Sequence, residues 1–205
     1  DESDVNPHRG YSGWACIRYG IGETLFKYSD SMELEPWLAQ SYENVDANTW
    51  KITLRDDVTF TSGRKMDAQA VKECLDDLVA VHERAAGDLK ISNMDADGQT
   101  LTITTKTPVA TLPGMLGDPL FIIIDTSVTD RDYAKQGPIC TGPYMVKEYS
   151  KAKAVMEANP NYWDGEVPYK HVEIPTIDDP NTRAMALQSG EIDMAINVAA
   201  GDLSL

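Results

Sequence analysis

The stretch "TWKITLRDDVTFTSGRKMDAQAVKECLDDL" (residues 49–78) decides the fold class, because it predicts a strand followed directly by a helix. Trp50, Ile52 and Leu54 alternate with polar residues, which predicts a strand with one buried face. Asp67 stands where a helix-capping residue is expected, and apolar residues recur at helical spacing after it. The apolar face of this predicted helix consists of Val71, Cys74, Leu75, Leu78 and Val79. A half-buried strand and an amphipathic helix together require a layered core of strands and helices.

The flanking sequence alternates predicted hairpins with predicted helices. Asp97-Gly98 is a turn signal between two alternating segments, so we expect residues 90–107 to form a hairpin. A second hairpin is expected at residues 142–160, and further strands at 121–124, 170–177 and 191–196. Helices are expected at residues 14–27 and 178–190, and short helices within 32–42 and 108–116. This order of elements predicts an α+β or mixed α/β fold.

The net charge and the lengths of the apolar runs limit which kinds of molecule or surface the chain can bind. The chain has 205 residues and a formal net charge of −15, which repels phosphate backbones, so we expect no nucleic-acid partner. No apolar run reaches the ~18 residues that a transmembrane helix needs. The first residues, "DESDVNPH", do not resemble a signal peptide, and we expect that a removed export signal would leave no trace.

Neither the cysteines nor the histidines form a recognisable metal or catalytic pattern. Cys16, Cys74 and Cys140 are widely spaced, so we predict buried thiols rather than a disulfide framework or a zinc site. The chain contains no P-loop, dinucleotide fingerprint, HExxH or GxSxG pattern. We therefore predict no catalytic residue. A carboxylate-dependent hydrolase stays as the enzyme alternative, because several acidic pairs occur.

The stretch "NPHRGYSGW" (residues 6–14) is the best candidate for a binding segment. It places Tyr11 and Trp14 beside glycines and cations, and rigid aromatic side chains on loops are common in small-molecule sites. The alternative interpretation is that these aromatic residues belong to the core. His8 has no nearby partner for a metal, so it is expected to fix the loop, and it is only a weak candidate for a metal ligand.

Several elements in a fixed order give the chain a family resemblance. They are "PWLA" at residues 36–39, "LRDDVTF" at 54–60, "TGPY" at 141–144, "NPNYW" at 159–163 and "DPNTRAMALQSGEID" at 179–193. Together they resemble the extracytoplasmic solute-binding proteins of peptide/nickel ABC importers, the family-5 binding proteins. Two departures are small: Cys140 stands where this family usually has glycine, and Ala70 where aspartate is common.

The resemblance implies an architecture and a cellular setting. It implies part of a periplasmic-binding-protein type II-like lobe with a mixed sheet, hairpins and flanking helices. Residues 1–205 would be the N-terminal portion of lobe I, without lobe II or the returning C-terminal segment. It also implies an extracytoplasmic location, in the periplasm or at the cell surface on a lipid anchor. The implied partners are a small-molecule ligand and an ABC permease and ATPase complex in the membrane.

The resemblance also implies a ligand and its contacts. The "NPH" opening is similar to that of the nickel/metal-chelate branch, where an aromatic loop and an arginine face the cleft between the lobes. The matching candidates for ligand binding are Tyr11, Trp14 and Arg84, with His8 beside them. We expect nickel or a metal chelate as transported ligand, with no resident cofactor. A di- or oligopeptide remains the alternative within the family, and a structural or sensing module remains outside it.

Overall fold

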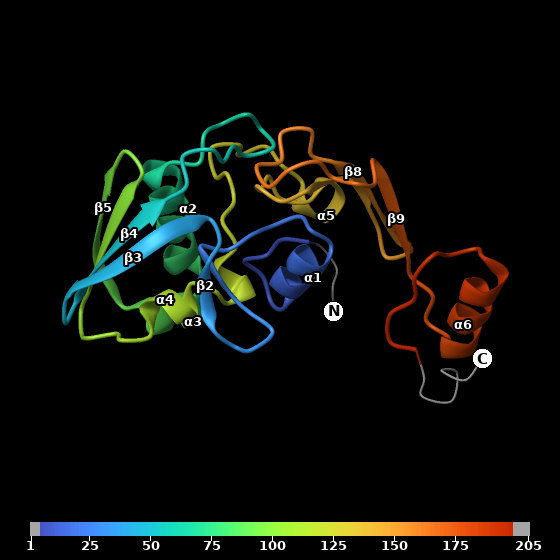
Figure 1. The fold of residues 1–205 in the computed structure, drawn as a ribbon, viewed down its shortest axis with the longest axis horizontal. Helices are drawn as coiled ribbons and strands as arrows, with labels where there is room; N and C mark the ends of the chain where they lie inside the picture. Colours follow the sequence, from blue (N-terminus) through green and yellow to red (C-terminus); the bar gives the residue numbers. More distant parts are fainter. Residues whose placement is uncertain (1–4, 199–205) are drawn as a thin grey trace.

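The computed structural model describes residues 5–198 and shows an elongated molecule with a sheet at one end and a helix at the other (Figure 1). A single hydrophobic core is built from residues between Val5 and Met156. Within residues 5–198, no helix has both the length and the apolar character needed to cross a membrane. The overall mixture of helices and several sheets confirms the predicted fold class.

The first sheet contains the strand that the sequence predicts best. It consists of β3 (Ala39–Asp46), β4 (Thr49–Leu54), β6 (Thr100–Thr105) and β5 (Ile91–Asp97), in that order. Trp50, Ile52 and Leu54 are buried, and Trp50 and Ile52 pair with Ile103 and Leu101 of β6. The predicted hairpin with its turn at Asp97-Gly98 is therefore confirmed as β5 and β6.

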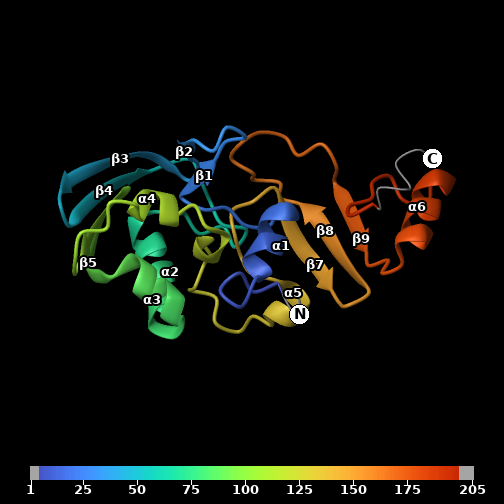
Figure 2. The same cartoon turned by 90° about the horizontal axis from the view of Figure 1, so that it is seen from below.

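The first of two consecutive helices packs on one side of this sheet, and the second packs on the first (Figure 2). They are α2 (Ala68–Val81) and α3 (Glu83–Leu89). The side chain of Asp67 accepts a hydrogen bond from the Ala70 N–H at 2.9 Å, which confirms the predicted cap. His82 is extended, and its Nδ1 accepts from the Ala85 N–H at 3.4 Å. Arg84 therefore starts a second helix instead of ending the first.

The N-terminal region contains less helix than predicted. The first helix, α1, covers only Ser12–Arg18, because the backbone turns at Gly20 with a φ of +67°. Residues 32–42 form no helix: β2 (Leu34–Pro36) pairs with β1 (Phe26–Tyr28), and β3 follows. Pro36 explains this difference, because proline lacks an N–H and favours an extended preceding residue.

A three-stranded sheet lies beyond α1 (Figure 1). It consists of β7 (Tyr144–Tyr149), β8 (Lys153–Ala158) and β9 (His171–Pro175), with α5 (Tyr133–Gln136) against β7. The predicted second hairpin and the strand after it are confirmed. The expected mixed sheet is wrong, because every strand pair formed by residues 5–198 is antiparallel. Hairpin connections are short, whereas a parallel pair needs a long crossover.

Helix α6 (Pro180–Ser189) lies apart from the first sheet, at the opposite end of the molecule (Figure 1). Asp179 caps it by accepting from the Thr182 N–H at 2.7 Å, and Gly190 ends it with a φ of +74°. The predicted strand after it is wrong: residues 191–196 are irregular, and Met194 and Ile196 are exposed. A strand requires a neighbour for its backbone hydrogen bonds, and residues 191–196 have none in the described chain.

The apolar run at residues 121–124 is buried as expected but is not a strand. It follows α4 (Leu112–Met115), which confirms the short helix, and it overlaps the 3₁₀ helix η1 (Pro119–Phe121). Its backbone forms hydrogen bonds with loop residues instead of with a neighbouring strand: the Ile123 N–H donates to the Glu23 carbonyl oxygen at 3.0 Å. The three cysteines are buried thiols outside any disulfide, as predicted.

Candidate functional site

A pocket of about 370 Å³ opens where α1, β1, α3, α4 and η1 meet. Three aromatic and three charged side chains line it, together with backbone at glycine positions. They are Trp14, Tyr28, Phe121, Arg84, Asp88 and Asp118. Trp14 and Tyr28 are about half exposed, whereas Phe121 is buried at the base. The arrangement combines exposed rings with a fixed set of charges, which is typical of a small-molecule site.

Two glycines allow the walls of the pocket to approach each other. A Cβ on Gly13 would lie 2.3 Å from the Pro119 carbonyl oxygen, far inside van der Waals contact. Helix α1 can therefore pack on η1 only without a side chain there, and this packing brings Trp14 to the rim. A Cβ on Gly114 would lie 2.6 Å from the Tyr28 hydroxyl, so a side chain there would displace the Tyr28 ring from its observed position.

Arg84 is held in place by two carboxylates. Its Nη2 donates to Asp118 Oδ2 at 2.6 Å, and its Nε lies 3.2 Å from Asp88 Oδ2, one helical turn along α3. The hydrogen bond with Asp118 raises the pKa of Arg84 above its usual value, so the guanidinium is charged. Because its side chain is 53% exposed, the guanidinium is also accessible from the pocket.

Asp118 itself is fixed from the other side. Its Oδ1 accepts from the Leu120 N–H at 2.9 Å and caps η1, while Oδ2 contacts Arg84. The charged edge of the pocket is thus tied to the same 3₁₀ helix on which α1 packs. Neither Asp118 nor Asp88 was predicted as a site residue. The 34-residue separation between Arg84 and Asp118 gives no local signal for Asp118. Asp88 lies four residues after Arg84, so helical spacing was the available signal for it.

His8 does not line the pocket but contacts the backbone of Ile122, next to Phe121 of the lining. Its Nε2 lies 2.9 Å from the Ile122 carbonyl oxygen, which requires the tautomer that donates from Nε2. Burial lowers the pKa of His8 below its usual value. The structure therefore supports His8 as the residue that fixes the loop. No group of three or more histidine, cysteine or acidic side chains within residues 5–198 could hold a metal ion.

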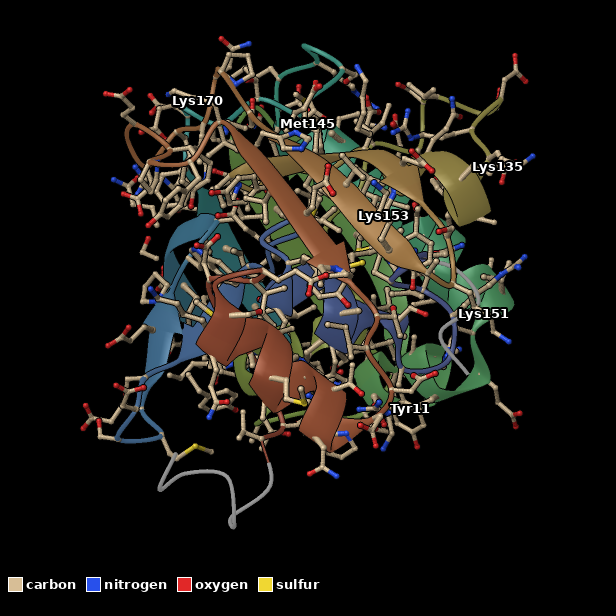
Figure 3. All side chains as sticks on the ribbon, turned by 90° about the vertical axis from the view of Figure 1, so that its right-hand side faces the viewer. Tyr11, Lys135, Met145, Lys151, Lys153 and Lys170 are labelled. Carbon is tan, nitrogen blue, oxygen red and sulfur yellow. The ribbon has the colours of Figure 1, made fainter. Side chains whose placement is uncertain are left out.

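The other predicted site residues divide between the rim and the solvent. Trp14 and Arg84 line the same pocket, although 70 positions separate them in the sequence. Tyr11 is 81% exposed and lies outside the pocket lining (Figure 3). The sequence did not identify Tyr28 and Phe121 as site residues. For Tyr28, the available signal was an aromatic residue directly after the segment "LFK". The role of these residues in ligand binding stays a prediction.

A buried carboxylate elsewhere has a structural role. Glu23 accepts hydrogen bonds from Thr141 Oγ1 at 2.6 Å, Tyr162 OH at 2.9 Å and Trp163 Nε1 at 3.0 Å. Burial raises its pKa despite these three donors. Arg55 lies over the Trp163 ring, 4.1 Å from its centre. Glu23 therefore joins three distant segments inside the protein and is closed to ligands.

Comparison with known proteins places these features in a family. The model of "Bacterial extracellular solute-binding proteins, family 5 Middle" matches residues 33–205. The nickel-binding protein NikA of Staphylococcus aureus is 31% identical over 183 residues, which are 89% of this chain and 37% of that protein. A probable D,D-dipeptide-binding periplasmic protein of Escherichia coli is 29% identical over 178 residues, 80% of this chain and 34% of that protein.

Solved structures share the same fold. A nickel ABC transporter structure from Bacillus halodurans matches with a TM-score of 0.91 and 33% identity over 98% of this chain and 42% of that one. NikA from Staphylococcus aureus in complex with Ni(L-His)2 matches with a TM-score of 0.84 and 30% identity over 92% of this chain and 40% of that one. The chain thus spans less than half the length of these relatives. Since the family model covers most of the sequence, the chain belongs to the bacterial extracellular solute-binding proteins of family 5.

Proposed function

We propose that this chain forms one wall of the ligand site in the substrate-binding component of an ABC importer. The main support for this proposal is the pocket in which Trp14 and Tyr28 are half exposed beside the fixed guanidinium of Arg84. Residues that close the site from the opposite side would lie outside this sequence. Family membership and the nickel-binding relatives support this function.

The proposed ligand is nickel that arrives already chelated by a small molecule. Aromatic rings can stack on a chelator, and a guanidinium can bind its carboxylates through directed hydrogen bonds. A chelated ion also needs few ligands from the protein, which suits a pocket with one arginine and no histidine in its lining. The metal in this proposal is cargo, and no resident cofactor or catalytic step is involved.

Transport would proceed by closure of two lobes around the chelate. Ligand contacts that exist only in the closed form shift the population toward that form, which a membrane permease with its ATPase would then recognise. This function requires a location outside the cytoplasm. That location agrees with the extracellular character of the family.

A di- or oligopeptide is the second candidate ligand. The same Arg84 guanidinium is suited to a peptide carboxylate, and the dipeptide-binding relative supports this alternative. The two candidates differ in how much of the binding energy the rings provide. The imidazole ring of a histidine chelate could stack on Trp14, whereas a dipeptide of aliphatic residues brings no ring.

Isothermal titration calorimetry on the full-length protein that carries this sequence tests the proposal. Nickel, nickel–histidine and a dipeptide mixture are titrated in turn into wild type, Trp14→Ala and the exposed control Tyr169→Ala. We expect nickel–histidine to bind, with weaker binding in Trp14→Ala and no change in Tyr169→Ala. Binding of dipeptides without binding of nickel–histidine would reject the metal-chelate ligand in favour of a peptide.

A further inference from the structure

The charges of the pocket do not balance. Its lining contains one cation, Arg84, and two anions, Asp88 and Asp118, so its formal charge is −1. Both carboxylates remain partly exposed: 35% of the Asp88 side chain and 31% of the Asp118 side chain are accessible. A ligand that reaches Arg84 therefore also comes close to two negative groups.

The two carboxylates are built into the site rather than free to swing away. Asp118 is held by the Leu120 N–H through Oδ1 and by Arg84 through Oδ2. Asp88 follows Arg84 by four residues on α3, so both side chains project from the same face of the helix. Nε and Nη2 of Arg84 already face protein carboxylates, which leaves Nη1 for a ligand.

We propose that Asp88 and Asp118 determine the charge class of the ligand: the pocket selects chelates of positive or balanced charge over strongly anionic ones. This inference rests on the proposed function, a chelate-binding site, and specifies which chelates enter. Nickel held by histidine carries a cationic centre, with the N–H groups of coordinated amines and imidazoles beside its carboxylates. Nickel–EDTA is a dianion, and its free carboxylate oxygens would face Asp88 and Asp118.

The physical basis is like-charge repulsion at short range in a partly desolvated pocket. Juxtaposed like charges weaken binding strongly at an interface, whereas one carboxylate of an amino-acid chelate can use Nη1 of Arg84. Its cationic part then lies toward Asp88 and Asp118 and gains from the same charges. A structural role alone for the two aspartates predicts no difference between the two kinds of chelate.

Asparagine substitutions separate the charge from the shape of these side chains. Asp118→Asn keeps an oxygen that can accept from the Leu120 N–H, so the cap on η1 is retained. Asp88→Asn likewise keeps the size of the side chain on α3. Asp57→Asn is the matched control: Asp57 also pairs with an arginine, Arg55, at 2.7 Å, but it lies outside the pocket lining.

The test is calorimetry with nickel–histidine and nickel–EDTA on the full-length protein and its variants, after thermal unfolding shows that each variant is folded. We expect wild type to prefer nickel–histidine. Each pocket asparagine should shift the ratio of the two dissociation constants toward nickel–EDTA by about tenfold, which corresponds to about 1.4 kcal/mol. Asp57→Asn should leave the ratio unchanged, and the shift should shrink at 1 M salt because the charges are partly exposed.

Four outcomes would overturn the inference. If wild type binds nickel–EDTA at least as tightly as nickel–histidine, or if the ratio does not move in the pocket variants, the aspartates are structural and the proposed function stands. If Asp57→Asn shifts the ratio equally, the effect comes from net charge and not from the pocket. If wild type binds neither chelate, the proposed metal-chelate ligand is rejected and the selectivity is rejected with it.

Discussion

The Nε2 atom of His8 lies 2.9 Å from the carbonyl oxygen of Ile122, 114 residues further along the chain. This contact joins the N-terminal loop to the segment that follows η1, next to Phe121 of the pocket lining. The histidine that first suggests a metal ligand thus positions the helix that bears Trp14. A neutral ring is sufficient for this role, and burial favours the neutral form.

The first prediction concerns the pH dependence of stability. The folded pKa of His8 is lowered by burial, so the unfolded chain binds the proton more readily than the folded one. The resulting stability is fully present above the unfolded pKa of about 6.5 and is lost as pH falls through the lower folded value. We expect His8→Gln to flatten the dependence of the melting temperature on pH below pH 6.5. Equal curves for wild type and His8→Gln would contradict the prediction.

The second prediction concerns the approach of α1 to η1. Gly13→Ala would place a methyl group 2.3 Å from the Pro119 carbonyl oxygen, so the helix must move outward. We expect a loss of about 1–3 kcal/mol of unfolding free energy in denaturant titrations, together with weaker ligand binding. Gly87→Ala is the control, since a Cβ there has no neighbour within 4 Å and alanine favours the helix α3. A neutral Gly13→Ala would show that the two elements are not in contact.

The third prediction concerns the buried carboxylate of Glu23. Burial raises the folded pKa of Glu23 above its usual value of 4.5, so its stability contribution is full below pH 4.5 and is lost as pH rises through the folded value. Glu23→Gln is always neutral and can still accept from Thr141, so it should lack this loss. Unfolding in urea at several pH values measures the difference, with the exposed Glu166→Gln as control. A constant difference between wild type and Glu23→Gln across pH would contradict this assignment.

The fourth prediction concerns Trp14 as a reporter of ligand binding. Its ring is 51% exposed at the rim of the pocket, so a bound chelate should change its surroundings and its fluorescence. We expect nickel–histidine to change the emission of the full-length protein, and we expect Trp14→Phe to remove most of that change. Trp37→Phe should keep it, because Trp37 does not line the pocket. An unaltered response in Trp14→Phe would place the ligand elsewhere.

Local sequence signals predicted most of the secondary structure. Asp67 and Asp179 cap helices through hydrogen bonds within four residues, and the Asp97-Gly98 turn joins adjacent strands. These features depend on neighbours in the chain, so they can be read without the fold. The predictions failed where backbone partners are distant: residues 121–124 bond to loops, and residues 191–196 find no strand beside them within the described chain.

The sequence by itself determined the fold class and the alternating strand at Trp50 to Leu54, and its family resemblance offered Tyr11, Trp14, Arg84 and His8 as candidates to face a ligand. Only the tertiary structure decided that Trp14 and Arg84 share one pocket, that Tyr11 and His8 do not line it, and that Asp118 accompanies Arg84 there. The reason is physical: periodicity and caps act over a few residues, whereas the charge of a site is a sum over side chains brought together from remote segments by packing. Gly13 shows how such packing depends on a single missing Cβ.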